Sequence, residues 1–454
     1  MQEVDRTRLR SLMASEVERF VTTHPRSGEL FSRARGSMLA GVPMPWMTEW
    51  AGPYPVFVAS ASGARVSDVD GQSYVDFCLG DTGAMAGHSP APTVEAVAAA
   101  SSRGITTMLP SEDSIWVGEE MARRFGLPYW QFCLTATDAN RFALRLAREI
   151  TGRPKVLVFA WCYHGSVDET FVVVGEDGSA RTRDDNIGPP VDPALTTRVV
   201  EFNDLAALER ELAAGDVACV LAEPALTNIG IVLPDEGFHD ALRRLTHRYG
   251  TLLVIDETHT ICAGPGGYTR EYGLQPDLLT IGKAIAGGVP AACYGMSEEV
   301  AARIQSRLDD MAVTDVGGIG GTLSGNALSL AAMRATLSEV LTDEAFASMV
   351  ALGARWADGV KSVIDELELP WEVQRLGARA EYWFRSSPPR TGAEAAAADD
   401  HELARFLHLH ALNRGVLLTP FHNMALMCPA TTEADVNTHN EVFRDAATSL
   451  VAEG

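Results

Sequence analysis

The sequence lacks a long uninterrupted apolar run. Its N-terminus, MQEVDRTRLRSLMASEVERF, mixes charged and apolar side chains at helical spacing, whereas a signal peptide or a membrane span needs a continuous apolar core. The 454 residues, 46% of them hydrophobic, are enough for a large α/β domain and a smaller one. We therefore expect a cytoplasmic globular protein.

Basic residues are also scarce. The chain has 37 lysines and arginines against 60 aspartates and glutamates, which gives a formal net charge of -23. Such a surface repels nucleic-acid phosphates and anionic lipid. We expect a small-molecule substrate, with neither nucleic acid nor a membrane as a partner.

The seven cysteines show no metal-binding or disulfide spacing. They are scattered and lie mostly in apolar runs, which indicates buried, reduced thiols. The stretch HELARFLHLH holds His401, His408 and His410 but not the HExxH pattern. An amphipathic helix with partly exposed histidines explains this stretch better than a zinc site does, so no metal site is expected.

Nucleotide-binding glycine patterns are missing too. GGIGGTLSGN, residues 317–326, is rich in glycine and precedes a helical pattern, but it does not match the Walker pattern. No GxGxxG follows a predicted strand. A nicotinamide-dependent oxidoreductase is therefore disfavoured.

From about residue 66 the chain alternates short apolar runs with helical patterns. The predicted strands are 130–134, 156–159, 217–221, 252–255 and 278–281, and the predicted helices are 91–101, 115–125, 138–150 and 237–249. This order is typical of a mostly parallel sheet with helices on its faces.

The two ends of the chain show other patterns. The N-terminal region predicts a helix followed by an irregular arm, VPMPWMTEW, whose Trp and Met side chains need another domain or subunit to pack against. The C-terminal region predicts a long helix over 326–367, strands within 371–384, an Ala-rich loop GAEAAAADD, a helix to residue 412, a strand at 416–418 and a closing helix. The other long loop expected is 175–193. We expect an N-terminal arm over 1–65 that contributes to a small domain, a large domain over 66–325 and a small C-terminal domain over 326–454.

Only three lysines, Lys155, Lys283 and Lys361, stand against 34 arginines (37 minus three). Lys155 precedes a predicted strand and Lys361 lies in a polar helical stretch, so both are expected at the surface. Lys283 lies instead at the end of the apolar strand in LLTIGKAIAGGVP. A desolvated amine in such a place is suited to forming a Schiff base near neutral pH. A lysine that reaches from a sheet edge into solvent fits the residues equally well.

A second apolar strand, in TLLVIDETHT, ends in Asp256 and Glu257. Ligands of parallel sheets bind at the carboxyl ends of the strands. A carboxylate there can hold a protonated ring nitrogen and keep that ring able to take up electrons. A helix cap is the ordinary alternative, but Lys283 follows at the end of the next predicted strand.

Three other stretches fit the same site. Thr135, Ala136 and Thr137 begin a predicted helix after a strand, which suits a phosphate, although such turns are more often plain caps. In WCYHG, Tyr163 offers a platform for a planar ring or is a core aromatic. The glycine-rich stretch 317–326 suits a second phosphate contact.

Taken together, these stretches resemble the class III aminotransferases, enzymes that depend on pyridoxal 5'-phosphate (PLP). Within them the chain is similar to the group with glutamate-1-semialdehyde aminomutase and the β-amino-acid aminotransferases. The likeness runs from about Gly52 to Val442 and includes DVDGQSYVDF, AGHSP, LRLAREITGRPK, CYHG, LAEPALTNIG, LLVIDE, PDLLTIGKAIAGG and GTLSGN.

The resemblance implies an α/β fold of the fold-type I PLP-dependent transferases, with a large domain on a mostly parallel central sheet and a small α+β domain. It implies a homodimer with active sites at the interface. Lys283 would form the Schiff base with PLP, Asp256 would pair with the pyridine nitrogen and Tyr163 would stack on the ring. The other cofactor residues implied are Thr135, Ala136 and Thr137 at the phosphate, Thr322 at the phosphate of the neighbouring subunit, and His164, Glu223 and Thr258.

Several positions depart from the family pattern. In the aminomutase an arginine for the substrate carboxylate, a tryptophan near the ring and a C-terminal glutamate stand where this sequence has Met47, Asp81 and Met424. The phosphate turn reads TATDA in place of SGTEA, and Thr258 replaces a valine. The first three changes argue against the aminomutase reaction.

The expected substrate pocket suits the apolar or aryl side of an amine, although His422 or an arginine could still bind a carboxylate. Its residues are Trp46, Met47, Asp81, Tyr163, Phe421, His422 and Met424.

The resemblance thus implies an aminotransferase that moves an amino group from an amine or a β- or ω-amino acid to an oxo acid such as pyruvate or 2-oxoglutarate. The mechanism would be ping-pong, with the freed Lys283 as general base. The alternatives are an aminomutase or a racemase on the same fold, and a noncatalytic PLP-fold binding protein. The presence of Lys283 and Asp256 argues against the last.

Overall fold

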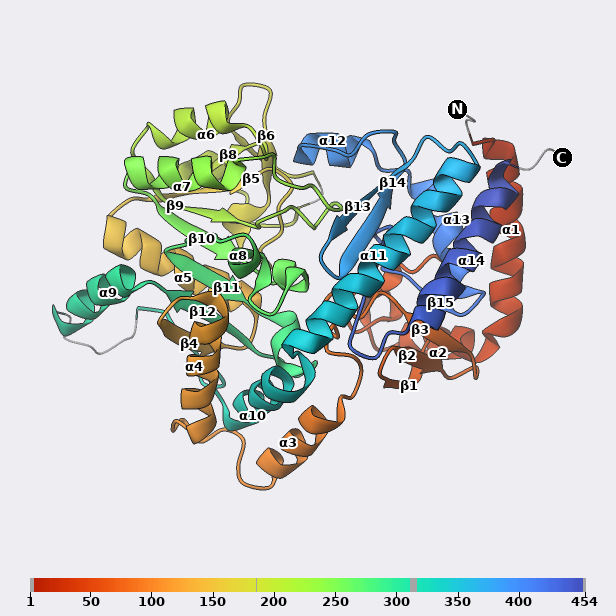
Figure 1. Ribbon diagram of the computed structural model, residues 1–454, viewed down its shortest axis with the longest axis horizontal. Helices are drawn as coiled ribbons and strands as arrows, with labels where there is room; N and C mark the ends of the chain where they lie inside the picture. The colour runs from red at the N-terminus through yellow and green to blue at the C-terminus, as the bar shows by residue number, and fades with distance from the viewer. Residues whose placement is uncertain (1–3, 185, 311–316, 452–454) are drawn as a thin grey trace. The chain divides into compact units, whose positions relative to one another are not determined.

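The computed structural model describes residues 4–184, 186–310 and 317–451, and its chain divides into two compact units (Figure 1). Unit one comprises the chain up to Pro90, Glu344–Pro388 and the chain from Ala398 onward. Unit two comprises Ala91–Asp343 and Pro389–Ala397. The limits of these units differ from the expected domain limits near residues 65 and 325. Residues 66–90 belong to unit one because the strands there pair with strands at 58–62 and 416–417, and helix α10 (Ala327–Ala335) belongs to unit two because it packs on α3 (Ala91–Ser101). The division into functional domains stays a prediction.

Unit two is built around a seven-stranded sheet with the order β4-β12-β11-β10-β9-β5-β8. Its strands are β4 (Tyr129–Cys133), β5 (Lys155–Phe159), β8 (Thr197–Val200), β9 (Val217–Ala222), β10 (Leu252–Asp256), β11 (Leu278–Ile281) and β12 (Ala292–Met296). From β11 to β8 all neighbours are parallel, while β12 runs antiparallel to both β11 and β4. The mostly parallel sheet predicted from the sequence is therefore present.

Helices cover this sheet because its central strands are buried along their whole length. Every residue of β9, β10 and β11 is buried, as their unbroken apolar sequences require. Helix α5 (Ala136–Thr151) places its apolar side against β9, β10, β11 and β12, while α6 (Leu205–Leu212) and α7 (Phe238–Arg248) lie side by side and contact β8 and β10 (Figure 1).

The remaining helices and strands of unit two are shorter or lie away from the central strands. They are α4 (Glu112–Phe125), β6 (Val172–Val174), β7 (Ala180–Thr182), α8 (Gly267–Glu271), α9 (Glu298–Asp310), and α12 (Gly392–Ala397).

Unit one contains two small sheets and long helices. Its helices are α1 (Arg6–Thr23), α2 (Pro25–Ala34), α11 (Asp343–Glu366), α13 (His401–Leu412) and α14 (Glu433–Val451). One sheet has the order β1-β2-β3-β15, from β1 (Val58–Ser62), β2 (Arg65–Asp68), β3 (Ser73–Asp76) and β15 (Val416–Leu417). The other is antiparallel with the order β13-β14-β16, from β13 (Glu372–Leu376), β14 (Arg379–Trp383) and β16 (Met424–Leu426).

Apolar side chains from both chain ends form one core in unit one. Phe20 of α1, Tyr74 of β3 and Leu409 of α13 pack together, and α13 contacts both α1 and α14. This contact is why the N-terminal helix and the C-terminal segment, far apart in sequence, belong to one unit.

Some predicted elements were wrong. The Ala-rich stretch GAEAAAADD is not all loop, since most of it forms α12, as its high helix propensity allows. The single long helix over 326–367 is interrupted at Leu341, where a short π-helical turn (Thr336–Val340) ends before α11 begins. The predicted loop 175–193 includes strand β7, and within it Asp185 lies outside the described residues.

The predicted helix over HELARFLHLH is present and His401 is exposed, but the other two histidines of α13 are not. His408 and His410 are buried, with exposed fractions of 5% and 3%. Nδ1 of His410 lies 2.9 Å from Glu16 and its Nε2 lies 3.0 Å from Asp445, so two carboxylates compensate for its burial.

All seven cysteines are free and buried, which confirms the expectation of reduced thiols. In the described ranges, no helix is long and apolar enough to cross a membrane. Within the same ranges, no cluster of three or more His, Cys, Asp and Glu side chains could hold a metal ion.

Candidate cofactor and catalytic site

Three neighbouring parallel strands of unit two end at the same edge of the sheet. Glu223 directly follows β9, Asp256 is the last residue of β10, and Lys283 comes two residues after β11. Asp256 lies opposite Thr280 in the register of β10 with β11. The sheet therefore brings together Asp256 and Lys283, which the sequence predicted at strand ends, and Glu223, which only the family resemblance implied.

Asp256 is buried and accepts three hydrogen bonds. Its Oδ2 accepts hydrogen bonds from Asn140 Nδ2 and His164 Nδ1, both at 2.8 Å, and its Oδ1 accepts one from the Thr258 backbone N–H at 3.0 Å. Only 3% of the residue is exposed. The carboxylate is thus held in one orientation by three partners from three segments of the chain.

The charge of this carboxylate is maintained despite its burial. Burial works to raise the pKa of Asp256, but the hydrogen bonds from His164 and Asn140 outweigh it and lower the pKa below its ordinary value. Burial alone would lower the pKa of His164, while Cys162 and Asp256 raise it well above the ordinary value. An ionised carboxylate in a dry site is what a protonated pyridine nitrogen needs as a partner, so the residues fit PLP.

Asn140 links the site to α5 and was not identified from the sequence. Its amide donates to Asp256 and to the His164 carbonyl oxygen at 3.1 Å, and its Oδ1 accepts from Thr280 Oγ1 at 2.6 Å. The residue is completely buried. The only hint in the sequence was a polar residue among the apolar positions of α5. Such a residue can support the core as readily as it can bind a cofactor.

The turn expected to hold a phosphate lies beside Lys283. Thr135 caps α5 by accepting the Asp138 N–H at 3.1 Å. A Cβ at Gly282 would lie only 3.1 Å from the Ala136 Cβ, so the start of α5 closely approaches the residue before the lysine. The first N–H groups of a helix attract anions, which suits a phosphate at Ala136 and Thr137.

The WCYHG turn also packs on the start of α5. Gly165 has φ +75°, and a Cβ there would lie 2.0 Å from Thr137 Oγ1, so only glycine fits. Thr137 Oγ1 accepts the Ser166 N–H at 3.1 Å. Tyr163, in the same turn, donates its backbone N–H to Glu223 Oε1 at 3.2 Å. The predicted ring platform and the predicted phosphate turn are therefore neighbours.

Glu223, at the end of β9, supports this turn by accepting the Tyr163 N–H. Its carboxyl group is buried and also accepts the Thr227 hydroxyl at 2.5 Å. Burial raises its pKa, with His164 and Thr227 acting in the opposite direction. Its observed contacts are with the backbone and Thr227, so its expected role at the cofactor stays a prediction.

Lys283 has an unusual backbone and a specific neighbour. Its φ of +54° lies in the left-handed region, which costs free energy for a residue other than glycine and is found at functional sites. Its Nζ lies 2.8 Å from Nε2 of His259, a residue that the sequence analysis did not single out. Thr322, expected at a neighbouring subunit's phosphate, is exposed in the loop before α10.

The residues predicted for the substrate pocket, apart from Tyr163, belong to unit one. Trp46 and Phe421 meet edge to face with ring centroids 5.3 Å apart, and the ring centroids of Phe421 and His422 are 5.1 Å apart. Met424 is buried at the start of β16, opposite Glu381 in the register with β14. Met47 is 38% exposed in the same short helical turn as Trp46 (Pro45–Thr48), and Asp81 has φ +48°. Their roles stay predictions.

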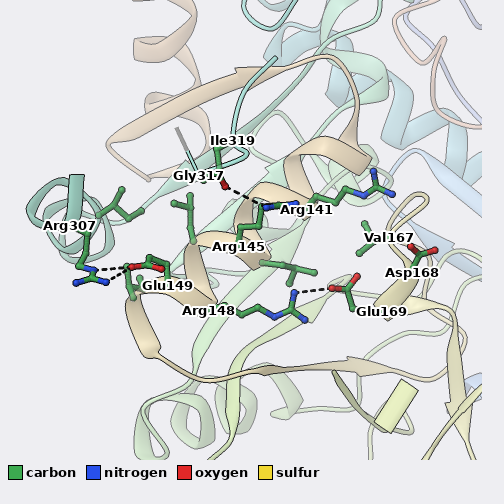
Figure 2. Close-up of a pocket in the computed structure, with 14 residues that line it drawn as sticks. Arg141, Arg145, Arg148, Glu149, Val167, Asp168, Glu169, Arg307, Gly317 and Ile319 are labelled. Atoms are coloured by element: carbon green, nitrogen blue, oxygen red, sulfur yellow. Dashed lines mark hydrogen bonds and ion pairs between the residues drawn. The ribbon is translucent and has the colours of Figure 1, made fainter. Parts of the chain in front are cut away.

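A cavity of about 740 Å³ lies elsewhere in unit two, along the outer side of α5 (Figure 2). Two ion pairs of its lining are marked in Figure 2, Arg148 with Glu169 at 2.8 Å and Arg307 with Glu149 at 2.6 Å. Neither Lys283 nor Asp256 lines it. We do not assign the catalytic site to this cavity. The polar groups that converge, and Asp256 with its lowered pKa, lie at the strand ends instead.

Comparison with known proteins agrees with this geometry. Residues 46–444 match the family Aminotransferase class-III, and the chain belongs to this family. A similar relative is a glutamate-1-semialdehyde 2,1-aminomutase of Desulfitobacterium hafniense, 34% identical over 431 residues that cover 94% of this chain and 98% of the relative.

Two solved structures are also similar. A glutamate-1-semialdehyde aminomutase variant from Pseudomonas aeruginosa PAO1 in complex with PMP is 51% identical, with TM-score 0.97 over 99% of this chain and 100% of that chain. An omega-transaminase from Sphaerobacter thermophilus is 27% identical, with TM-score 0.84 over 94% of this chain and 98% of that chain.

These similarities confirm two predictions from the sequence. The fold is that of the fold-type I PLP-dependent enzymes, and the cofactor is pyridoxal 5'-phosphate. The names of the curated relatives agree with the predicted alternative, an aminomutase, better than with the aminotransferase interpretation, while a transaminase also occurs among the solved structures.

Proposed function

We propose that this protein is a PLP-dependent aminotransferase that moves an amino group from an amine or a β- or ω-amino acid to an oxo acid. One observation carries the proposal: the ionised, buried Asp256 at the end of β10 and the amine of Lys283 just after β11 share one edge of the sheet. Amino-group chemistry on PLP needs an amine that can join the cofactor and a negative charge near its ring nitrogen.

Each residue of the site has a definite task in this proposal. When bound, PLP supplies an aldehyde for amino groups and a ring that takes up the electron pair left when a proton departs. Lys283 Nζ binds the cofactor and, when free, takes a proton from the substrate carbon and returns it. Asp256 holds its charge at the ring nitrogen, oriented by His164 and Asn140. The first N–H groups of α5 bind the phosphate.

The substrate side of the proposal rests on unit one. Trp46 and Phe421 form an aromatic pair in which each residue is 41% exposed, and Met47 lies beside Trp46 in the chain. Such side chains favour an apolar or aryl group. An amino donor such as 1-phenylethylamine should therefore be turned over in preference to β-phenylalanine, and a strong preference for the acid would contradict the amine assignment.

A second candidate, an aminomutase, is favoured by the names of the relatives. The replacement of its expected arginine, tryptophan and glutamate by Met47, Asp81 and Met424 weighs against it. The two functions differ in one requirement, because an aminotransferase needs a separate oxo acid whereas an aminomutase returns the amino group to the same molecule.

The requirement for an acceptor separates the two candidates. The purified protein is mixed with a panel of amines, and with glutamate-1-semialdehyde, in the presence and absence of pyruvate or 2-oxoglutarate. Sustained turnover of an amine only with an oxo acid supports the aminotransferase. Multiple turnovers of glutamate-1-semialdehyde without any oxo acid would assign the aminomutase instead.

A variant with Lys283→Ala serves as the control for both candidates. It should lose the yellow imine band and lose turnover by several orders of magnitude, since the covalent attachment and the proton transfer share this amine. A wild-type protein that shows the imine band but no half-reaction with any amine would instead favour a noncatalytic binding protein.

We further propose that the protein acts as a homodimer in which Thr322 reaches the phosphate of the neighbouring subunit. Mixing Lys283→Ala chains with Thr322→Ala chains, each of low activity alone, should form heterodimers with one intact site and restore part of the activity. A monomer in solution, or mixing without any recovery, would contradict the shared site.

A further inference from the structure

The amine of Lys283 has a well-defined neighbour. Its Nζ lies 2.8 Å from Nε2 of His259, the distance of a hydrogen bond in which the amine donates to the ring nitrogen. Both side chains are half-buried, so water competes only in part for this bond.

The backbone around His259 is fixed on both sides. Three residues earlier, Asp256 is held by its hydrogen bonds at the end of β10. The intervening Glu257 is fully buried and accepts the Thr260 hydroxyl at 2.5 Å and the Tyr268 N–H at 3.1 Å. The imidazole is therefore presented by a rigid turn and not by a mobile loop.

The lysine is presented in an equally definite way. Its φ of +54° fixes the direction in which the side chain leaves the backbone, and the close approach of Gly282 to Ala136 holds the preceding residue. Because β10 and β11 are parallel neighbours, the two turns that follow them bring His259 and Lys283 together.

We propose that His259 is a positioning residue for Lys283, whose Nε2 accepts a hydrogen bond from Nζ whenever the amine is not joined to the cofactor. This inference rests on the proposed function, in which the amine is freed and rejoined in every cycle. A lysine has a flexible four-carbon stem, and a free amine without a partner would spend its time in many rotamers. The His259 contact keeps it at the strand ends.

The first test requires neither bound PLP nor a measurement of enzymatic activity. The full-length chain freed of PLP is treated with a limiting amount of an amine-selective acylating reagent, and acylation at each lysine is followed by mass spectrometry. The wild type is compared with His259→Leu, which removes the acceptor, and with His259→Gln, whose side-chain oxygen can still accept. Lys155 and Lys361, paired with Asp216 and Asp365, are internal controls in the same molecule.

We expect Lys283 to react about tenfold faster in His259→Leu, the scale of one lost hydrogen bond to a charged group, and close to the wild-type rate in His259→Gln. Lys155 and Lys361 should not change. If His259→Leu does not fold, His259→Asn replaces it, because an asparagine amide is too short to reach Nζ, and the same increase is expected.

The second test measures the rate at which the yellow imine band appears when PLP is added to the same chains. It should fall about tenfold in His259→Leu and recover in His259→Gln. Acylation of Lys283 that is equal in all variants, alone or together with weaker PLP binding, would overturn the proposal and assign His259 to another role. If the wild type shows no imine band, the proposed function is refuted. The acylation test still decides whether His259 positions Lys283, because it does not involve PLP.

Discussion

The two units hold their candidate functional side chains in opposite ways. In unit two, Asp256 is buried and its three hydrogen bonds come from α5, from the WCYHG turn and from its own strand end. In unit one, Trp46 and Phe421 touch each other but remain about two-fifths exposed. In the proposed function, the sheet fixes the reaction centre, whereas substrate recognition would rest on side chains that can change with little effect on the fold.

After the loss of Lys283, the largest effect on turnover is expected from the charge at the end of β10. Asp256→Asn keeps the shape but replaces a carboxylate with a neutral amide, so turnover should fall by about 10²-fold or more, the scale for removing one electrostatic stabiliser. The imine band should still form, because Lys283 is unchanged. Single-turnover kinetics with the best amine measures the loss, and a loss below about threefold would contradict the role of this charge.

A smaller effect is expected from the residue that orients this carboxylate. Asn140→Ala leaves Asp256 and Thr280 each without one buried partner, which should lower the free energy of unfolding by about 2 kcal/mol and turnover by about tenfold. Denaturant titration and steady-state kinetics measure the two losses. Full activity together with lower stability would show that Asn140 only supports the fold.

In unit one the expected effect is on stability at acid pH. Glu16 of α1 is buried and accepts hydrogen bonds from Asn413 at 2.7 Å and Arg414 at 2.8 Å, and it lies 2.9 Å from His410. Burial works to raise its pKa, but His410 and Asn413 lower it from the ordinary 4.5 to about 2.

The direction of the pH effect follows from this lowered pKa. Because Glu16 binds its proton more weakly in the folded chain, its stabilisation is complete above pH 4.5 and disappears as the pH falls toward 2. Glu16→Gln should cost about 2 kcal/mol at neutral pH and much less near the lower end of that range. Urea titrations at both pH values test this, and an equal cost at both would contradict the lowered pKa.

The smallest effect on the protein as a whole is expected at the aromatic pair. Phe421→Ala removes a ring that is 41% exposed, so it should change the unfolding free energy by about 1 kcal/mol or less. It should raise KM for an aryl amine several-fold while leaving that for a small aliphatic amine nearly unchanged. An equal change for both amines would exclude Phe421 from substrate recognition.

Some parts of the fold were predictable because their sequences allow a single arrangement. The strands β9, β10 and β11 are unbroken apolar runs, and only a sheet covered on both faces buries such runs. Strand β12 was missed, since AACYGM has few β-branched residues and its antiparallel direction depends on its neighbours β4 and β11. The helix in GAEAAAADD was missed although alanine has the highest helix propensity, because its six residues are too few to show the apolar periodicity of a helix.

The sequence by itself indicated that Asp256 and Lys283 follow two successive apolar strands of a mostly parallel sheet, because apolar runs alternate there with helical patterns. Only the tertiary structure decided that Asn140 and His164 hold the carboxylate and that His259 meets the amine. These contacts join segments separated by tens of residues or by a turn, and a hydrogen bond depends on distances of a few ångströms that no local pattern encodes.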